Sequence, residues 1–316
     1  PLNRFDLVGF SLQYELTYTN ILNILDLGQI PLNASERDKD LPLVIAGGPG
    51  AFNPEPLVPF IDLFVIGEGE EVILELVDSY QQWQDSSGTK GQLLKELSQL
   101  PGLYVPTFPK VTMKRIIKDL DSAPYPVSPI VPYTKIIHDR VALEVARGCS
   151  RSCRFCQAGI IYRPLRERSP ENIKELARKS LQNTGYDEVS LVSLNTGEYS
   201  CLTPLVADLM QELVPQRVSL SLPTLRPGSL NPRILEEIGR VRKTGFTLVP
   251  EAGTERLRKV INKEMEEDQL LRDIENLLDS GWDAFKLYFM IGLPTETQED
   301  IDGIISLCQR VLALSK

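Results

Sequence analysis

Three cysteines are spaced as Cys-x3-Cys-x2-Cys in the middle of the chain: Cys149, Cys153 and Cys156. Thiolates are the preferred ligands of iron–sulfur clusters and of other soft metal sites. A four-iron cluster held by three thiolates keeps one iron free of protein, as a catalytic zinc keeps an open position. The only histidine is His138, and the other cysteines, Cys201 and Cys308, are far along the chain. The spacing therefore predicts a reactive cluster, with a zinc site or a chance group of cysteines as the alternative.

The overall composition is ordinary for a globular protein in a reducing compartment. Of the 316 residues, 42% are hydrophobic and 24% are charged, which leaves room for two domains. The net charge of −9 argues against broad, non-specific binding to nucleic acid. No apolar run is long enough to cross a membrane, and no signal peptide opens the chain. Five cysteines, three of them in a cluster pattern, favour the cytoplasm over a disulfide-forming compartment.

The first hundred residues alternate between short apolar runs and helical patterns. The predicted strands and helices are Asp6–Phe10, Thr17–Leu27, Leu43–Gly48, Phe64–Ile66 and Glu71–Trp83. This order predicts a doubly wound α/β domain with a parallel sheet over residues 1–103. Ligands of such folds bind beyond the carboxyl ends of the strands. Because the chain begins with Pro1 and not with methionine, we expect the natural N-terminus to lie upstream.

A proline-rich connector over residues 104–139 leads to a second α/β region at 140–316. Pro124, Pro126, Pro129 and Pro132 favour an extended, ordered linker. Beyond it, strand and helix patterns alternate five times. The predicted strands are Ala142–Ala146, Glu188–Leu194, Val218–Leu222, Phe246–Pro250 and Phe285–Ile291. The predicted helices are Pro170–Asn183, Thr203–Leu213, Pro232–Val241, Glu267–Ser280 and Gln298–Leu314.

The cysteine spacing, the aromatic Phe155 before the third cysteine and the strand-like Val141–Ala146 resemble the radical S-adenosylmethionine (SAM) superfamily. The resemblance implies a 4Fe–4S cluster whose free iron chelates SAM. It also implies that an electron from the reduced cluster splits SAM into methionine and a 5′-deoxyadenosyl radical, which abstracts hydrogen from a substrate. A reducing partner such as flavodoxin or ferredoxin would supply the electron. Cores of this superfamily usually contain six βα units, so we expect a partial (β/α)6 barrel here, either trimmed or continued in the natural sequence.

Carboxyl ends of the second and third barrel strands carry the first candidate SAM ligands. Ser193–Tyr199 resembles the Gly-Gly-Glu element of the superfamily, with Gly197 and Glu198 placed to hold the SAM ammonium. Thr196 replaces the first glycine, and a solvated loop carboxylate is the alternative for Glu198. Ser221 follows on the third strand, where an ordinary strand serine would look the same.

Two further elements follow the fourth and fifth barrel strands. Glu251, in Val249–Arg256, resembles the Glu-x-Gly-Ser/Thr signature that contacts the ribose hydroxyls or methionine, although Thr254 also suits a helix cap. The superfamily places the backbone of the next element, here Ile291 and Gly292, against adenine, which a glycine lets approach closely.

Six arginines crowd the segment around the cysteines: Arg147, Arg151, Arg154, Arg163, Arg166 and Arg168. Most charge runs are solvated faces. Beside a cluster that becomes more anionic on reduction, cations favour the reduced state and can clamp an anionic substrate group. We therefore predict a site role for at least two of them. Cys201, near a predicted helix start, is either a reactive thiol or a small buried residue, and Cys308 is predicted to be core.

The N-terminal domain resembles the cobalamin-binding half of B12-type radical SAM proteins of a subfamily without an assigned substrate. The resemblance rests on Ser11–Leu16, on Gly47-Gly48 and on Gly67–Glu71. The Asp-x-His-x-x-Gly motif that supplies the lower axial histidine does not occur in the chain. Either a truncated N-terminus or a degenerate binder that no longer holds corrinoid would explain this departure.

The sequence thus predicts a radical SAM enzyme that starts with hydrogen abstraction, or with methyl transfer if cobalamin is present. Methylthio transfer to RNA is a poor alternative, because the second cysteine trio of that branch is missing. A non-catalytic iron–sulfur sensor or electron-transfer module is the alternative from another class. A SAM-binding scaffold with an open, truncated barrel is the third interpretation. The substrate is not predicted.

Overall fold

The computed structural model describes residues 1–86, 88–134, 136–223, 225–229, 231–243 and 245–314. These residues form two compact units, Pro1–Lys118 and Asp119–Lys316, and the boundary falls inside the segment predicted as a connector. The last two residues of the predicted barrel segment, 315 and 316, lie outside the described residues. No helix in the described part of the chain is long and apolar enough to cross a membrane.

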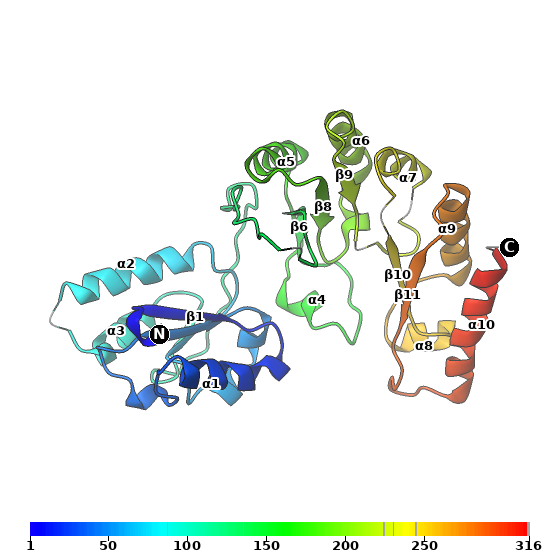
Figure 1. The fold of residues 1–316 in the computed structure, drawn as a ribbon. Helices are drawn as coiled ribbons and strands as arrows, with labels where there is room; N and C mark the ends of the chain where they lie inside the picture. Colours follow the sequence, from blue (N-terminus) through cyan, green and yellow to red (C-terminus); the bar gives the residue numbers. More distant parts are fainter. Residues whose placement is uncertain (87, 135, 224, 230, 244, 315–316) are drawn as a thin grey trace. The chain divides into compact units, whose positions relative to one another are not determined.

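The first unit contains a sheet with helices packed on it (Figure 1). The sheet has four strands in the order β1-β2-β3-β4. Its strands are β1 (Leu7–Ser11), β2 (Leu43–Gly47), β3 (Leu63–Val65) and β4 (Leu103–Tyr104). The first three strands are parallel, as predicted, whereas β4 runs antiparallel to β3. Two helices, α2 (Val72–Gln84) and α3 (Lys90–Leu97), separate β3 from β4. Because the second helix returns the chain to the carboxyl edge of the sheet, the next strand has to run the opposite way.

Helices cover both faces of this sheet. The helix α1 (Tyr18–Leu27) packs with Val8 and Val44 in one apolar cluster, and α2 and α3 pack with Leu43 and Ile45 in the other. Successive residues of β2 thus serve opposite faces, as the two-residue period of a strand requires. The predicted α/β class of this unit is confirmed.

The described residues of the second unit form a three-stranded and a two-stranded parallel sheet and a small antiparallel pair. The larger sheet has the order β5-β8-β9, and β10 pairs with β11. These strands are β5 (Val141–Glu144), β8 (Glu188–Val192), β9 (Ser219–Ser221), β10 (Phe246–Glu251) and β11 (Phe285–Phe289). The antiparallel pair joins β6 (Ala146–Arg147) to β7 (Arg166–Glu167). The five predicted strand–helix units are confirmed.

The helices of this unit are α4 (Ala158–Ile161), α5 (Pro170–Thr184), α6 (Leu202–Leu213), α7 (Pro232–Ile238), α8 (Glu255–Val260), α9 (Glu267–Asp279) and α10 (Gln298–Leu314). The helices α5, α6, α7, α9 and α10 pack on one side of these strands in a common apolar core, whereas α4 and α8 lie outside that core (Figure 1). Short 3-10 turns complete the chain at Leu2–Arg4, Glu15–Thr17, Ala34–Glu36, Pro49–Phe52, Glu55–Leu57 and Thr196–Glu198.

Alternate strand residues of the second unit face the helices or point away from them. Leu143, Leu191 and Leu248 belong to the apolar core under the helices. Their neighbours Glu144, Ser190 and Thr247 therefore lie on the opposite face, which is polar. Within each sheet the parallel direction brings the carboxyl ends of the strands to one edge. The segment after β6 joins these edges, since the N–H of Arg154 donates to the carbonyl of Ile261 after β10 and Arg151 bonds to Glu198 after β8.

Candidate functional site

The three cysteines lie on one loop that follows β6 at this edge. All three are half-buried free thiols. The backbone N–H of Arg151 donates to Cys149 Sγ over 3.4 Å, and the N–H of Cys156 donates to the carbonyl of Cys153 over 3.0 Å. Hydrogen bonds of the first kind stabilise thiolate character and tune cluster potentials.

A second segment, after α8, holds the cysteine loop in place. The N–H of Arg154 donates to the carbonyl of Ile261 over 2.9 Å. Asn262 adopts a positive φ of 55° and donates its amide to the carbonyl of Ser152 over 2.8 Å. Both bonds involve main-chain groups of the cysteine loop, and asparagine is a residue type that tolerates the left-handed region. The loop is thus attached to its surroundings through its own main chain, without the help of the thiols.

Cys153 lies in a positively charged environment. Burial raises the pKa of its thiol, and the positive charges of Lys263 and Arg226 oppose this rise. The other two cysteines also contribute to the rise, so the three thiols interact electrostatically. Neither Lys263 nor Arg226 was predicted as a site residue. Lys263 lies in a segment of mixed charge and Arg226 is an isolated basic residue, so neither carries a sequence signal of its own.

Glu198 is held by the cysteine loop. Arg151 donates Nε to its Oε1 over 2.8 Å, and Ser150 donates Oγ to its Oε2 over 3.3 Å. Burial tends to raise the pKa of Glu198, but the bonds and charge of Arg151, helped by Arg226 and Ser150, outweigh it and hold that pKa below its usual range. The carboxylate predicted to meet a SAM ammonium is therefore ionised and directed at the cysteine loop.

Glu251 ends β10 and pairs with Lys263, whose Nζ lies 3.2 Å from Oε1. The side chain of Lys263 is only 9% exposed, and that of Glu251 only 13%. Glu251 also adopts a φ of +69°, which is uncommon for a residue with a Cβ. Its carbonyl accepts the N–H of Met290 over 2.8 Å, so the strained residue joins β10 to the segment after β11. Strain of this kind concentrates at ligand-binding positions.

Ile291 and Gly292 lie in the loop after β11. Ile291 is 75% exposed, and a Cβ added to Gly292 would meet nothing within 4 Å. The N–H of Gly292 donates to Glu296 Oε1 over 2.9 Å, while Oε2 of the same carboxylate is buried without a partner. The amide of Asn195, in the loop after β8, is likewise buried with no partner for either polar atom. Unpartnered buried groups mark places where a ligand or water is expected, and sequence reasoning missed both residues.

Thr295 in the same loop has a φ of +66°, in the left-handed region that β-branched residues avoid. We expect Thr295→Gly to raise the free energy of unfolding by about 0.5–1 kcal/mol, since the relieved strain exceeds the added chain entropy. Urea unfolding followed by Trp282 fluorescence in a Trp83→Phe background would measure this. Thr295→Ala, which keeps the Cβ, should recover less, and a less stable glycine variant would contradict the prediction.

The other predicted site residues are Phe155 and Gly197 at this edge, and Ser221, whose side chain bonds to the first residue of β8. Phe155 is 40% exposed beside Cys156. A Cβ added to Gly197 would lie 2.2 Å from Ser229 Oγ, so packing already restricts this position. Ser221 donates its hydroxyl to Glu188 over 2.9 Å. Their roles toward SAM stay predictions, and the hydroxyl of Ser221 is already engaged within the chain.

The six arginines divide by their partners. Arg147 pairs with Glu144, and Arg163 donates to Ser152 Oγ over 2.9 Å. Arg168 is 3% exposed and donates to the carbonyl of Glu144 over 3.2 Å. Arg154 and Arg166 also bond to main-chain carbonyls. Arg151 bonds to Glu198, a predicted SAM ligand. Cys201 and Cys308 are half-buried.

A cavity of about 320 Å³ adjoins the cysteine loop. Its lining residues are Glu144, Ala146, Arg147, Gly148, Tyr162, Val192, Ser193 and Leu194. Arg147 neutralises Glu144 through two bonds of 2.9 and 2.7 Å. Burial raises the pKa of Tyr162, so its phenol is neutral at pH 7. The cavity is small, largely apolar and placed at the carboxyl ends of β5 and β8, where substrates of β/α barrels bind.

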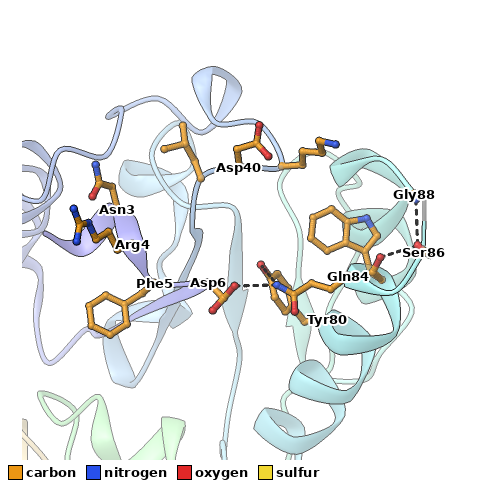
Figure 2. Close-up of a pocket in the computed structure, with 12 residues that line it drawn as sticks. Asn3, Arg4, Phe5, Asp6, Asp40, Tyr80, Gln84, Ser86 and Gly88 are labelled. Carbon is orange, nitrogen blue, oxygen red and sulfur yellow. Dashed lines mark hydrogen bonds between the residues drawn. The ribbon is translucent and has the colours of Figure 1, made fainter.

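The larger cavity of about 730 Å³ in the first unit lies elsewhere, at the amino ends of β1 and β2 (Figure 2). Its polar groups bond to one another: Gln84 donates to Asp6 over 2.9 Å and lies 3.4 Å from the hydroxyl of Tyr80. Ligands of doubly wound folds bind at the opposite, carboxyl edge. Size alone therefore does not make this cavity the functional site.

The donor set of the cysteine loop fits a 4Fe–4S cluster. Among the described residues, no group of three His, Cys, Asp or Glu side chains is arranged to hold a single metal ion. A four-iron cluster binds each thiolate to a different iron, so its ligands need not converge on one point. Three free thiols on one loop, beside cations that compensate a cluster's negative charge, meet that requirement.

Comparison with known families decides the assignment of this edge. The family profile described as "Radical SAM superfamily" matches residues 143–308, and "Radical SAM proteins, N-terminal" matches residues 1–106. The chain belongs to the radical SAM superfamily. Radical SAM proteins use a 4Fe–4S cluster and SAM, and the predicted resemblance is confirmed.

This radical SAM chain is similar in sequence or in fold to several known proteins. It is 32% identical to "Uncharacterized protein MJ0966" of Methanocaldococcus jannaschii, over 98% of this chain and 64% of the relative. It is 25% identical to a tRNA-2-methylthio-N(6)-dimethylallyladenosine synthase of Ehrlichia chaffeensis, over 96% and 68%. The cobalamin-dependent radical SAM enzyme OxsB has a similar fold, with a TM-score of 0.70 at 15% identity over 96% of this chain and 43% of OxsB. The chain thus spans under two thirds of the length of MJ0966 and under half of OxsB.

Cobalamin fits the first unit only in part. At Gly48 an added Cβ would lie 2.9 Å from the carbonyl oxygen of Leu12, and at Gly67 it would lie 2.3 Å from that of Arg115. These glycines therefore serve the packing of the chain itself. The single histidine, His138, belongs to the second unit. A histidine-ligated corrinoid site is not formed by these residues, and we assign no chemical step to cobalamin.

Proposed function

We propose that the chain is the catalytic part of a radical SAM enzyme that cleaves SAM reductively to start a reaction on an unidentified substrate. The observation that carries this proposal is the loop with three free, half-buried cysteines at the carboxyl edge of the strands, bonded directly to Glu198. When bound to that loop, a reduced 4Fe–4S cluster supplies the electron that splits SAM into methionine and a 5′-deoxyadenosyl radical.

The residues have the following proposed roles. The three cysteine thiolates hold the cluster and leave one iron open. The ionised carboxylate of Glu198 accepts hydrogen bonds from the SAM ammonium. Glu251 accepts ribose hydroxyls, and the exposed backbone at Ile291 and Gly292 receives adenine. Phe155, Gly197 and Ser221 complete the proposed SAM environment.

The small cavity beside the cysteine loop is the proposed substrate site, since it adjoins the place where the radical would form. The electron is proposed to come from a partner such as flavodoxin or ferredoxin. The cytoplasm is the proposed compartment, because free thiols and a reducible cluster need reducing conditions.

The decisive experiment is anaerobic reconstitution of the chain with iron and sulfide, followed by incubation with dithionite and SAM. We expect 5′-deoxyadenosine and methionine to form in equal amounts. A chain that carries a full complement of cluster but forms no 5′-deoxyadenosine would contradict the proposal and would support a non-catalytic iron–sulfur module.

A further inference from the structure

The guanidinium of Arg151 bridges two carboxylates from different segments of the second unit. Its Nε donates to Glu198 Oε1 over 2.8 Å, and its Nη1 donates to Glu264 Oε2 over 2.5 Å. A further bond joins Nη2 to Glu198 Oε1, while Ser150 donates to Oε2. Glu198 follows β8, whereas Glu264 follows α8, and Arg151 lies between the first two cysteines of the loop.

Glu198 is nearly saturated by these donors. An ionised carboxylate offers about four lone-pair sites. Arg151 takes two of them and Ser150 takes one. A SAM ammonium, with three N–H groups, would find about one site still open. The SAM ammonium and the loop residues Ser150 and Arg151 therefore require the same carboxylate oxygens of Glu198.

We propose that Arg151 competes with the SAM ammonium for Glu198, and that Glu264 retains Arg151 when SAM displaces it. This inference rests on the proposed function. Because the guanidinium already contacts both carboxylates, it gives up Glu198 without losing its last ion pair. Arg151 thereby becomes a positioning residue that links SAM binding to the loop carrying Cys149 and Cys153.

The burial of the three side chains suits such an exchange. Arg151 is 39% exposed and Glu264 is 69% exposed, so their ion pair is weak and easily reoriented in water. Glu198 is less exposed, at 28%. The guanidinium of Arg226 bonds to the main-chain carbonyl of Glu264 and holds that segment beside the site. The carboxylate of Glu251 is already paired with Lys263. Glu264, which already bonds to Arg151, is therefore the carboxylate that keeps the guanidinium when it leaves Glu198.

The test measures the dissociation constant of SAM for the reconstituted full chain, at matched iron content, by equilibrium dialysis under anaerobic conditions. Glu264→Gln should weaken SAM binding about threefold, within the range of an exposed ion pair. Arg151→Met should tighten binding by a similar factor. The double variant should match Arg151→Met, because Glu264 acts only through Arg151.

Two controls test whether the change in SAM affinity depends on the contact between the SAM ammonium and Glu198. Glu212→Gln removes the same charge from another arginine–glutamate pair, Arg178–Glu212, and should leave SAM binding unchanged. 5′-Methylthioadenosine lacks the ammonium, so its affinity should not respond to Glu264→Gln. If Arg151→Met weakens SAM binding, or if Glu264→Gln has its full effect in the Arg151→Met background, the competition is refuted.

The experiment distinguishes failure of the proposed function from failure of the proposed competition. A parent that assembles its cluster and does not bind SAM refutes the proposed function itself. If Arg151→Met fails to assemble the cluster, the comparison of Glu264→Gln with Glu212→Gln still decides, since both substitutions lie outside the cysteine loop. Equal SAM affinities in those two variants would refute the competition.

Discussion

Replacing Cys153 by alanine should reduce bound iron and 5′-deoxyadenosine formation to the level of a reaction without protein. Two thiolates on a single loop are too few to hold a four-iron cluster. Among the described residues, no group of three His, Cys, Asp or Glu side chains is arranged to hold a metal ion in place of the loop. Iron and sulfide analysis, with chromatography of the products after incubation with SAM and dithionite, would measure both losses.

Cys201→Ala is the matched control for this prediction. Cys201 is also a half-buried free thiol of the second unit, but it precedes α6 and lies outside the cysteine loop. The control should keep the iron content and the product yield of the parent. Equal losses in the two variants would mean that cysteine content, and not the loop, controls assembly. Parent-level iron in Cys153→Ala would remove Cys153 from the ligand set.

The fold was predictable wherever apolar periodicity was strong. The predicted helix Gln298–Leu314 has the bounds of α10, and the predicted strands Leu43–Gly48 and Phe285–Ile291 differ from β2 and β11 by one or two residues at their ends. The strand β2 is a continuous apolar run buried on both faces, whereas β11 and α10 alternate less exposed and more exposed residues, and either pattern specifies the element from sequence alone. The helix α3 escaped prediction because its start depends on the capping box of Thr89 and Gln92, a local signal that reaches only three residues.

The candidate site was predictable for residues that carry motifs and not for those that act by position. The cysteines follow from their spacing alone. Lys263 and Glu264 occur in a segment of mixed charge that resembles a solvated helix face, yet the turn after α8 brings them to Glu251 and Arg151. The arginine crowding was visible, but five of the six have partners such as main-chain carbonyls, Ser152 or Glu144. Pairing between distant segments cannot be derived from composition.

Gly253→Ala should lower the free energy of unfolding of the second unit by about 3 kcal/mol, at the upper end of the usual cost of overpacking. Gly253 follows Glu251 by two residues and lies directly against α10. An added Cβ would lie 2.3 Å from both the carbonyl oxygen of Asp300 and the amide nitrogen of Ile304. Both contacts are backbone atoms of one helix, so no side chain can rotate away and α10 itself would have to move.

Unfolding by urea in a Trp83→Phe background would measure this loss, because the chain has two tryptophans and Trp282 then reports on the second unit alone. Gly245→Ala is the matched control, since a Cβ there meets nothing within 4 Å. Moving α10 would also shift Asp300, which accepts bonds from Thr254 and Arg256 and so fixes the turn after Glu251. SAM affinity should therefore fall together with stability in Gly253→Ala. If stability fell while SAM affinity stayed at the parent value, the turn carrying Glu251 would not contribute to SAM binding.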